Sequence, residues 1–358
     1  MRVLILALAI LLGIGGRASA APTPTVSKAT DGVFTAFRSH PLVGLAEYHN
    51  LAQELDFYAT LVADPRFASE VSNVVLETGT AAQQEIVDRY VNGEHVPYAE
   101  LHKVWDDTDW NPTVGSVGSL RLYAVIREIN QTLPPEKRIK VWLGGLPTDW
   151  SKIKRADWNW DSITNESSRH IAGLIEREIL AKNKKALVIY GGYHFGVYPP
   201  GLHFTAGNIR ALIDSAHPGA LFVIWPYAGY ATTTCAARFE KHIRNWPTPA
   251  LVGPIRGSSW EKDAYQPGCG ALPRFPQQAA TEYEADMRNF AGLTGDALLY
   301  LGPRSQQVNG PYNPAIYLDL DFRAELDRRN QIKNGKPLDY LTAQSGANAA
   351  VARPFWPN

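Results

Sequence analysis

The chain has 358 residues, and its 35 Lys and Arg side chains balance 35 Asp and Glu, so the formal net charge is zero. This balance argues against a nucleic-acid-binding protein, which usually carries a basic excess. Hydrophobic residues make up 45% of the chain and charged residues 20%. Such a composition is typical of a globular protein with a sizeable core and excludes disorder over most of the length.

The first twenty residues have the pattern of a secretory signal peptide. Arg2 gives a positive start, residues 3–14 form an apolar run, and residues 18–20 (Ala-Ser-Ala) have the small-x-small pattern of a cleavage site. The apolar run is about twelve residues long, shorter than the roughly 20 that a membrane-spanning helix needs. We therefore expect an exported protein, periplasmic or secreted, without stable membrane insertion; a membrane anchor is the alternative.

Short apolar runs then alternate with helical patterns in one predicted domain, residues 40–330, after a polar leader at 21–39. The runs are nearly continuous, as in strands that are buried on both faces of a parallel sheet. The predicted strands are 41–46, 74–77, 139–143, 186–190, 220–226 and 297–301. The predicted helices are 49–62, 81–91, 119–129, 168–181 and 318–329. This alternation predicts an α/β fold, with a mostly parallel central sheet and helices on both faces.

Two loop-rich insertions and a tail complete the predicted organisation. Residues 92–116 are rich in Trp and Asp, residues 227–295 contain the two cysteines of the chain, and residues 331–358 form a C-terminal tail. We expect Cys235 and Cys269 to form a disulfide, because exported proteins fold in an oxidising compartment. The alternative, half of a zinc site, lacks the usual C-x₂-C spacing.

Glutamate and histidine residues follow three of the predicted strands directly. Glu47 and His49 come after the first strand, Glu77 comes directly after the apolar residues 74–76 of the second, and His194 comes after the run 186–190. Because parallel strands end at one edge of the sheet, where ligands bind, we expect the four to form a catalytic site or, if a metal is present, to ligate it. A lone acid there would more simply be a helix cap. We expect His49 to begin a helix and to be neutral, as a base must be.

A second set of candidates comes from the helices that precede parallel strands, because such helices begin at the same edge. Arg169 and His170 open the predicted helix 168–181, and Asp149 follows the strand 139–143. We expect these three to bind the substrate. The simpler alternative is that Arg169 pairs with a neighbouring acid on its helix. Arg121, at the start of another predicted helix, is a weaker candidate.

Several well-known catalytic motifs are absent from the sequence. There is no G-x-S-x-G nucleophile elbow, no G-x-x-x-x-G-K-[ST] phosphate loop, no G-x-G-x-x-G fingerprint after a strand and no H-E-x-x-H motif. The sequence therefore argues against the serine hydrolases, nucleotide-binding proteins and zinc proteases that those motifs mark.

The strand-end motifs E-Y-H, V-V-L-E and G-G-Y-H, with L-L-Y-L-G late in the chain, resemble one superfamily. It unites the erythromycin esterase-like hydrolases, the ChaN haem-uptake lipoproteins and the Tiki/TraB proteins. The E-x-H spacing matches the ChaN branch, whereas the esterases usually have E-x-x-H. The chain departs from the pattern in having Ala46 where the motif usually has Gly, and in lacking the acylated Cys of ChaN. The site residues that the resemblance implies are Glu47, His49, Glu77, Arg169, Gly191 and His194.

Three functions remain open at this stage. The first is an exported hydrolase of esters or amides, in which His49 activates water. The second is a Tiki-like metal-dependent peptidase that holds a divalent ion. The third is a ChaN-like protein that binds haem or a similar hydrophobic ligand without catalysis, in a cleft lined by residues 105–123. The sequence thus leaves the cofactor open between none, a divalent metal and haem, and it leaves the oligomeric state and the substrate open.

Overall fold

The computed structural model describes residues 20–108, 117–196, 207–230, 232–266, 269, 295–311 and 319–338. In these residues the chain folds around one eight-stranded sheet with the order β1-β7-β8-β6-β2-β5-β3-β4. The strands are β1 (Thr25–Lys28), β2 (Leu42–Glu47), β3 (Asn73–Thr80), β4 (Lys140–Gly145), β5 (Ala186–Gly191), β6 (Leu221–Pro226), β7 (Ala250–Gly253) and β8 (Ala297–Tyr300). Strand β7 is antiparallel to β1 and β8, and the other neighbouring strands pair in parallel. The predicted α/β fold with a mostly parallel sheet is confirmed.

Helices connect these strands. They are α1 (Ala29–Ser39), α2 (Ala52–Ala63), α3 (Pro65–Glu70), α4 (Gln84–Val91), α5 (Tyr98–Leu101), α6 (Lys103–Asp106), α7 (Val117–Gln131), α8 (Trp160–Glu178), α9 (Ile209–Ala216), α10 (Thr233–Glu240), α11 (Glu261–Ala264) and α13 (Leu320–Asn334). One 3₁₀ turn matters for the site, η6 (Gly192–Phe195), which directly follows β5.

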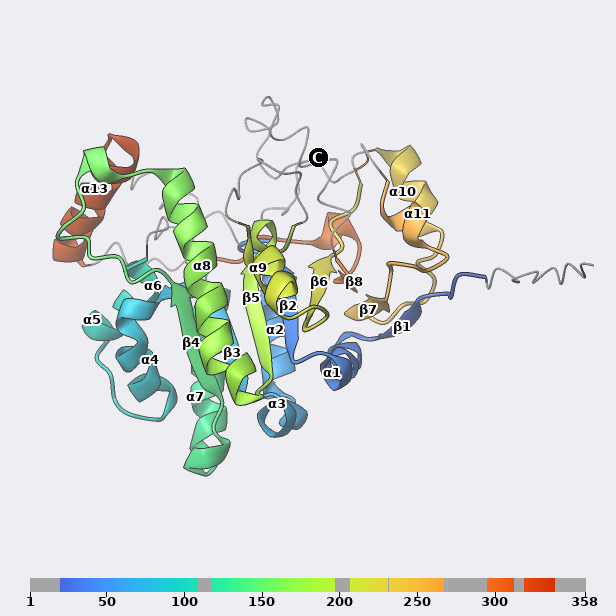
Figure 1. The fold of residues 1–358 in the computed structure, drawn as a ribbon, viewed down its shortest axis with the longest axis horizontal. Helices are drawn as coiled ribbons and strands as arrows, with labels where there is room; N and C mark the ends of the chain where they lie inside the picture. Colours follow the sequence, from blue (N-terminus) through green and yellow to red (C-terminus); the bar gives the residue numbers. More distant parts are fainter. Residues whose placement is uncertain are drawn as a thin grey trace, which may run out of the picture.

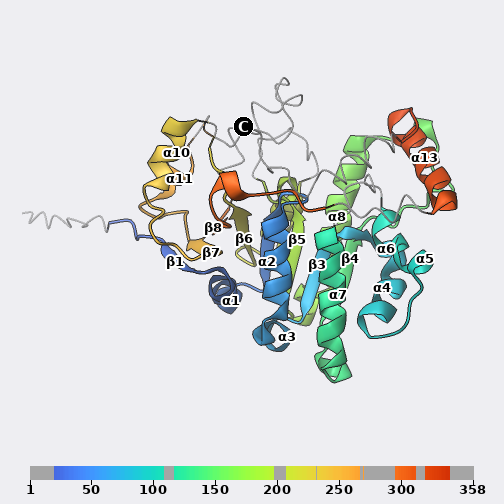
Figure 2. The same cartoon turned by 180° about the vertical axis from the view of Figure 1, so that it is seen from behind.

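The central strand β2 shows how the core is divided. All six of its residues are buried. Val43 and Leu45 belong to a hydrophobic cluster that includes residues of α1, α2 and α7, whereas Leu42 and Ala46 belong to a second cluster with residues of α8 and α9. In Figure 1, α8 and α9 lie in front of the sheet. In Figure 2, which shows the molecule from the opposite side, α2 and α7 lie in front of it. Because an apolar cluster packs against each face of β2, its sequence is a nearly continuous apolar run.

The polar leader predicted at residues 21–39 is wrong, because this segment forms β1 and α1. Val33, Phe34 and Phe37 are at most 1% exposed and lie in the core, so α1 is part of the fold. Their i, i+3 and i+4 spacing is an amphipathic helix pattern. Strand β1 finds its partner only in β7, more than two hundred residues away, which local sequence patterns do not reveal.

Two other predicted boundaries are also corrected. Helix α8 begins at Trp160, where the Asn159 side chain caps it by accepting from the backbone N–H of Ser162, so it starts before the predicted Ser168. The closing helix α13 runs to Asn334, with Gly335 in the left-handed conformation at its C-cap, and so extends into the predicted tail. The rest of that tail, from residue 339, lies outside the described residues.

The region 227–295, expected to be loop-rich, contains α10, β7 and α11 among its described residues. The predicted disulfide between Cys235 and Cys269 is confirmed, with an S–S distance of 2.03 Å. The side chain of Gln266 donates to the carbonyl of Cys235 next to the bridge, over 2.9 Å. The signal-peptide residues 1–19 lie outside the described residues. None of the helices in the described part of the chain is long and apolar enough to cross a membrane.

Candidate functional site

Three neighbouring parallel strands, β2, β5 and β3, deliver the candidate site residues to one edge of the sheet. Glu47, the last residue of β2, is in register with Gly191, the last residue of β5. Leu76 of β3 is in register with Ile189 of β5, so Glu77 follows at the level of the next β5 residue. The turn η6 leaves β5 directly and carries His194. The register of a parallel sheet thus places all these residues at the carboxyl edge.

The four predicted catalytic residues form two Glu–His pairs at this edge. His49 Nδ1 lies 3.5 Å from Glu47 Oε1, and His194 Nε2 lies 3.2 Å from Glu77 Oε1. The backbone N–H of Gly191 donates to the second oxygen of Glu77. Glu47, Glu77 and His194 are 6 to 7% exposed, while the His49 side chain is 31% exposed. His49 is therefore the member of the set that is most open to solvent.

The two pairs meet at Gly191. A Cβ atom at this position would lie 3.0 Å from Nε2 of His49 and 3.2 Å from Oε2 of Glu77. The backbone of Gly191 has φ −51° and ψ 140°, which any residue can adopt. The glycine therefore serves to leave room for these two side chains, and not to allow an unusual backbone.

Glu77 is held as a carboxylate at neutral pH. Its burial pushes its pKa up, but His194, His49 and the N–H of Gly191 together outweigh burial and lower the pKa below the ordinary value. Charge-assisted hydrogen bonds of this kind favour the ionised form of a buried acid.

His49 differs from the sequence expectation in its charge. Burial lowers its pKa, but the hydrogen bond and charge of Glu47 and the charges of Glu77 and Glu54 raise it to about 9. The expected neutral ring rested on a position at a helix N-terminus. Helix α2, however, begins at Ala52, three residues later. His49 is therefore an imidazolium at neutral pH, and the carboxylates decide its charge instead of the helix dipole.

Sequence reasoning missed a third acid, Glu54, in the first turn of α2. Its side chain is fully buried, and its Oε2 accepts the backbone N–H of Tyr48 over 3.0 Å. Its Oε1 accepts the hydroxyl of Tyr58. Burial, followed by the charge of Glu47, raises the pKa of Glu54 well above the ordinary value. The available signal was an acid beside Leu55 on an otherwise apolar helix face.

Arg169 and His170, predicted to bind substrate at the start of a helix, lie about two and a half turns inside α8. Arg169 is exposed, and His170 is half-buried. Burial and then the charge of Arg177 lower the pKa of His170. Because α8 starts at Trp160 and not at Ser168, the argument that put both residues at the carboxyl edge fails.

Asp149 and Arg121 are also engaged elsewhere. Asp149 forms an ion pair with Lys152 at 2.7 Å, and its side chain is 50% exposed. Its hydrogen bonds with Lys152 and Ser151 lower its pKa to about 2. Arg121 forms an exposed ion pair with Asp56 at 2.5 Å. These ion pairs engage both residues with their own neighbours and not with the two Glu–His pairs.

The chemistry of the donor set does not fit a metal centre in the described part of the chain. Among these residues, no three His, Cys, Asp or Glu side chains are placed so that they could hold one ion. The geometry instead pairs each histidine with one carboxylate.

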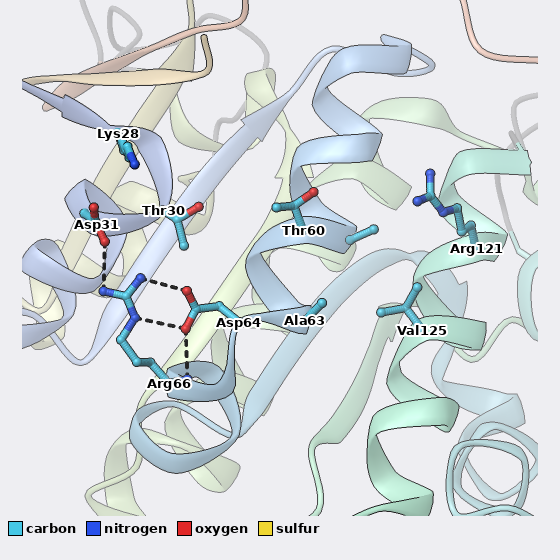
Figure 3. A pocket seen from close by; sticks show the side chains of 10 residues that line it. Lys28, Thr30, Asp31, Thr60, Ala63, Asp64, Arg66, Arg121 and Val125 are labelled. Atoms are coloured by element: carbon cyan, nitrogen blue, oxygen red, sulfur yellow. Dashed lines mark hydrogen bonds and ion pairs between the residues drawn. The ribbon is translucent and has the colours of Figure 1, made fainter. Parts of the chain in front are cut away.

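A charged hollow at another place in the molecule offers a contrast to this site. It is lined by residues of α1, α2, α3 and α7, including Asp31, Asp64, Arg66 and Arg121. Figure 3 shows Arg66 between Asp64 and Asp31, with ion pairs of 2.7 and 2.9 Å. Its arginines are thus already paired with carboxylates at the surface.

No protein-family model matches the sequence, and no curated protein matches it. Among solved structures, the chain is similar to a succinoglycan biosynthesis protein with a TM-score of 0.54 and 7% identity, over 78% of this chain and 93% of that one. It is similar to a Bacillus cereus protein with a TM-score of 0.48 and 11% identity, over 78% and 94% of the two chains. It is also similar to the haem-binding ChaN of Campylobacter jejuni, with a TM-score of 0.32 and 14% identity, over 57% and 91%. The first of these likenesses shows a shared fold.

Proposed function

We propose that this protein is a hydrolase that uses the Glu47–His49 pair for acid–base catalysis on an ester or amide. The observation that carries the proposal is the pair of adjacent Glu–His contacts at the carboxyl edge, in which His49 alone is substantially open to solvent. Ligands of open α/β sheets bind at this edge. The resemblance of the strand-end motifs to the erythromycin esterase-like, ChaN and Tiki superfamily supports the same site.

The charge state of His49 assigns its role. As an imidazolium it is a proton donor, so it donates its Nε2 proton to the leaving oxygen or nitrogen. A water molecule attacks the carbonyl carbon and gives its proton to the Glu47 carboxylate. The bond to the leaving group breaks, an acid and an alcohol or amine result, and proton exchange with solvent restores the pair.

The Glu77–His194 pair places a fixed, buried carboxylate close to His49. Both side chains are buried, and Glu77 is held by the N–H of Gly191 as well as by His194. The negative charge of Glu77 contributes to the raised pKa of His49. A preorganised charge of this kind stabilises a proton donor without reorganisation during the reaction.

The alternative function is haem binding of the ChaN type, and a test must distinguish it from hydrolysis. Iron ligation by His49 needs a neutral imidazole. The carboxylates around His49 favour the imidazolium, so the geometry supports acid–base chemistry better.

The proposal is tested with the purified protein on a panel of p-nitrophenyl esters and anilides. We expect His49→Gln to lower the turnover of an accepted compound by about 10²–10⁴-fold. His217→Gln, which alters a half-exposed histidine paired with Glu176, is the matched control and should leave turnover unchanged. Equal turnover in the wild type and His49→Gln would remove His49 from the mechanism. A Soret band from stoichiometric haem would favour the binding protein.

We further propose that the protein is exported. The support is the signal-peptide pattern of the first twenty residues and the disulfide between Cys235 and Cys269. The intact mass of the protein isolated from its producing cells should lack those residues, and a mass that retains them would contradict cleavage.

A further inference from the structure

Glu54 is a buried acid that the proposed chemistry does not use. It lies in the first turn of α2, and its side chain is inaccessible to solvent. Its carboxyl group accepts hydrogen bonds from the backbone N–H of Tyr48 and the hydroxyl of Tyr58. The first of these bonds reaches six residues back along the chain, across the turn that connects β2 with α2.

Tyr48 is the residue between Glu47 and His49, and it is held at both ends. Glu54 holds its main chain, and Trp225 at the end of β6 donates to its hydroxyl over 3.1 Å. On the far side of His49, Asn50 has a left-handed φ of 70°, and its side chain donates to the carbonyl of Gly310 over 2.7 Å. The path of the main chain through His49 is therefore fixed by groups from other segments.

We propose that Glu54 is the residue that positions the Glu47–His49 pair, by holding the main chain of Tyr48 between the two. This inference rests on the proposed function of that pair, but it concerns the geometry of the pair and can fail or succeed separately. Glu54 does not touch the reacting atoms in this scheme.

The chemical cost of a carboxyl group at this position supports a dedicated role. Burying an acid costs free energy unless its oxygens are bonded, and an aliphatic side chain would pack on this helix face without that cost. The charged and titratable groups that act on Glu54 are Glu47, His49 and Tyr58. Burial and the charge of Glu47 raise the pKa of Glu54, while its hydrogen bonds with Tyr58 and Tyr48 and the charge of His49 lower it.

The test compares two variants by NMR titration of the ring of His49, assigned from the spectrum of His49→Gln. Glu54→Leu removes the acceptor of the Tyr48 N–H, so we expect the Glu47–His49 contact to loosen and the pKa of His49 to fall from about 9 towards its ordinary 6.5. Tyr58→Phe removes the other hydrogen bond of Glu54 but keeps the bond to Tyr48. It should lower the melting temperature and leave the titration of His49 unchanged.

A third variant, Glu54→Gln, separates position from charge and retains the shape needed for folding. Its amide oxygen can accept the Tyr48 N–H and its amide NH₂ can donate to the Tyr58 oxygen. The pKa of His49 should therefore stay raised, reduced only by the contribution of the Glu54 charge, which is the smallest of those that raise it. The proposal is overturned if Glu54→Leu titrates like the wild type. If that variant does not fold, a fall of the His49 pKa to near 6.5 in Glu54→Gln or in Tyr58→Phe would overturn the proposal, because both variants keep the bond to the Tyr48 N–H and the raised pKa would then not depend on it. Since the readout is a titration, a lack of hydrolytic activity would leave this result intact.

Discussion

The carboxyl edge of the sheet and the hollow in Figure 3 hold similar ion pairs in different surroundings. At the edge, the His194 and Glu77 side chains are 9% and 7% exposed. In the hollow, the Arg66 and Asp31 side chains are 41% and 54% exposed, although their contact is shorter. Water and salt screen an exposed pair to about 0–1 kcal/mol, whereas a buried pair must compensate the loss of hydration of both charges. Burial, and not contact distance, therefore separates a candidate site from a charged surface.

The largest expected effect comes from breaking the buried pair. Glu77→Gln leaves His194 and the N–H of Gly191 without their carboxylate, so we expect the free energy of unfolding to fall by about 3–5 kcal/mol. Because the folded-state pKa of Glu77 lies below its unfolded value, this contribution is present above about pH 4.5 and is lost as the pH falls further. Urea denaturation at pH 7 and at pH 4 measures both statements. Asp56→Asn, at an exposed pair, is the control, and a similar loss in both variants would mean that burial has no influence.

A second effect concerns the pH dependence that His49 gives to stability. The pKa of His49 is raised from 6.5 to about 9 on folding, so its contribution is complete below pH 6.5 and lost as the pH rises to about 9. We expect His49→Gln to remove a decline of roughly 2 kcal/mol between these limits, a value reduced for the partial exposure of the ring. Denaturant titrations at pH 6, 7.5 and 9 provide the measurement. If the free energy of unfolding changes with pH in the same way in the wild type and in His49→Gln, the ring of His49 is not held as an imidazolium.

A smaller effect probes the space at Gly191. Gly191→Ala places a methyl group about 3 Å from His49 and Glu77 without backbone strain, so it should cost about 1–2 kcal/mol and lower the pKa of His49 by pushing the ring away. Gly173, inside α8, has nothing within 4 Å of its would-be Cβ. Gly173→Ala should therefore stabilise the protein, by up to about 1 kcal/mol. Thermal melts measure the stability of both variants, and the NMR titration measures the pKa of His49. An equal gain in stability from the two substitutions would contradict the crowding at Gly191.

The smallest effect is expected in the hollow. Arg121→Ala removes an ion pair with Asp56 in which both side chains are more than half exposed, so the stability should change by no more than about 0.5 kcal/mol. The measurement is urea denaturation at low and at physiological salt. A loss comparable with that of Glu77→Gln would show that this surface pair has a structural role that its exposure does not suggest.

The sequence by itself determined the six parallel strands of the sheet, β2, β3, β4, β5, β6 and β8. Strands such as β5 are buried over all their residues, and a continuous apolar run is the direct consequence of that burial. Glu47, Glu77 and His194 lie together because each is at or near the carboxyl end of such a strand and parallel strands end at one edge. This inference needs no knowledge of distant contacts, which is why it was possible from the sequence.

The tertiary structure alone decided what depends on groups far apart in the chain. The charge of His49 depends on the start of α2 at Ala52 and on Glu77 of another strand as well as on Glu47, so the expected helix N-terminus gave the wrong protonation state. The role of Glu54 depends on the fold of the turn over which it reaches back to Tyr48. Strand β1 exists because β7 pairs with it. Local sequence patterns indicate which residues are buried. They do not indicate which distant residues come close together in the fold, and strand pairing and electrostatic interactions depend on that proximity.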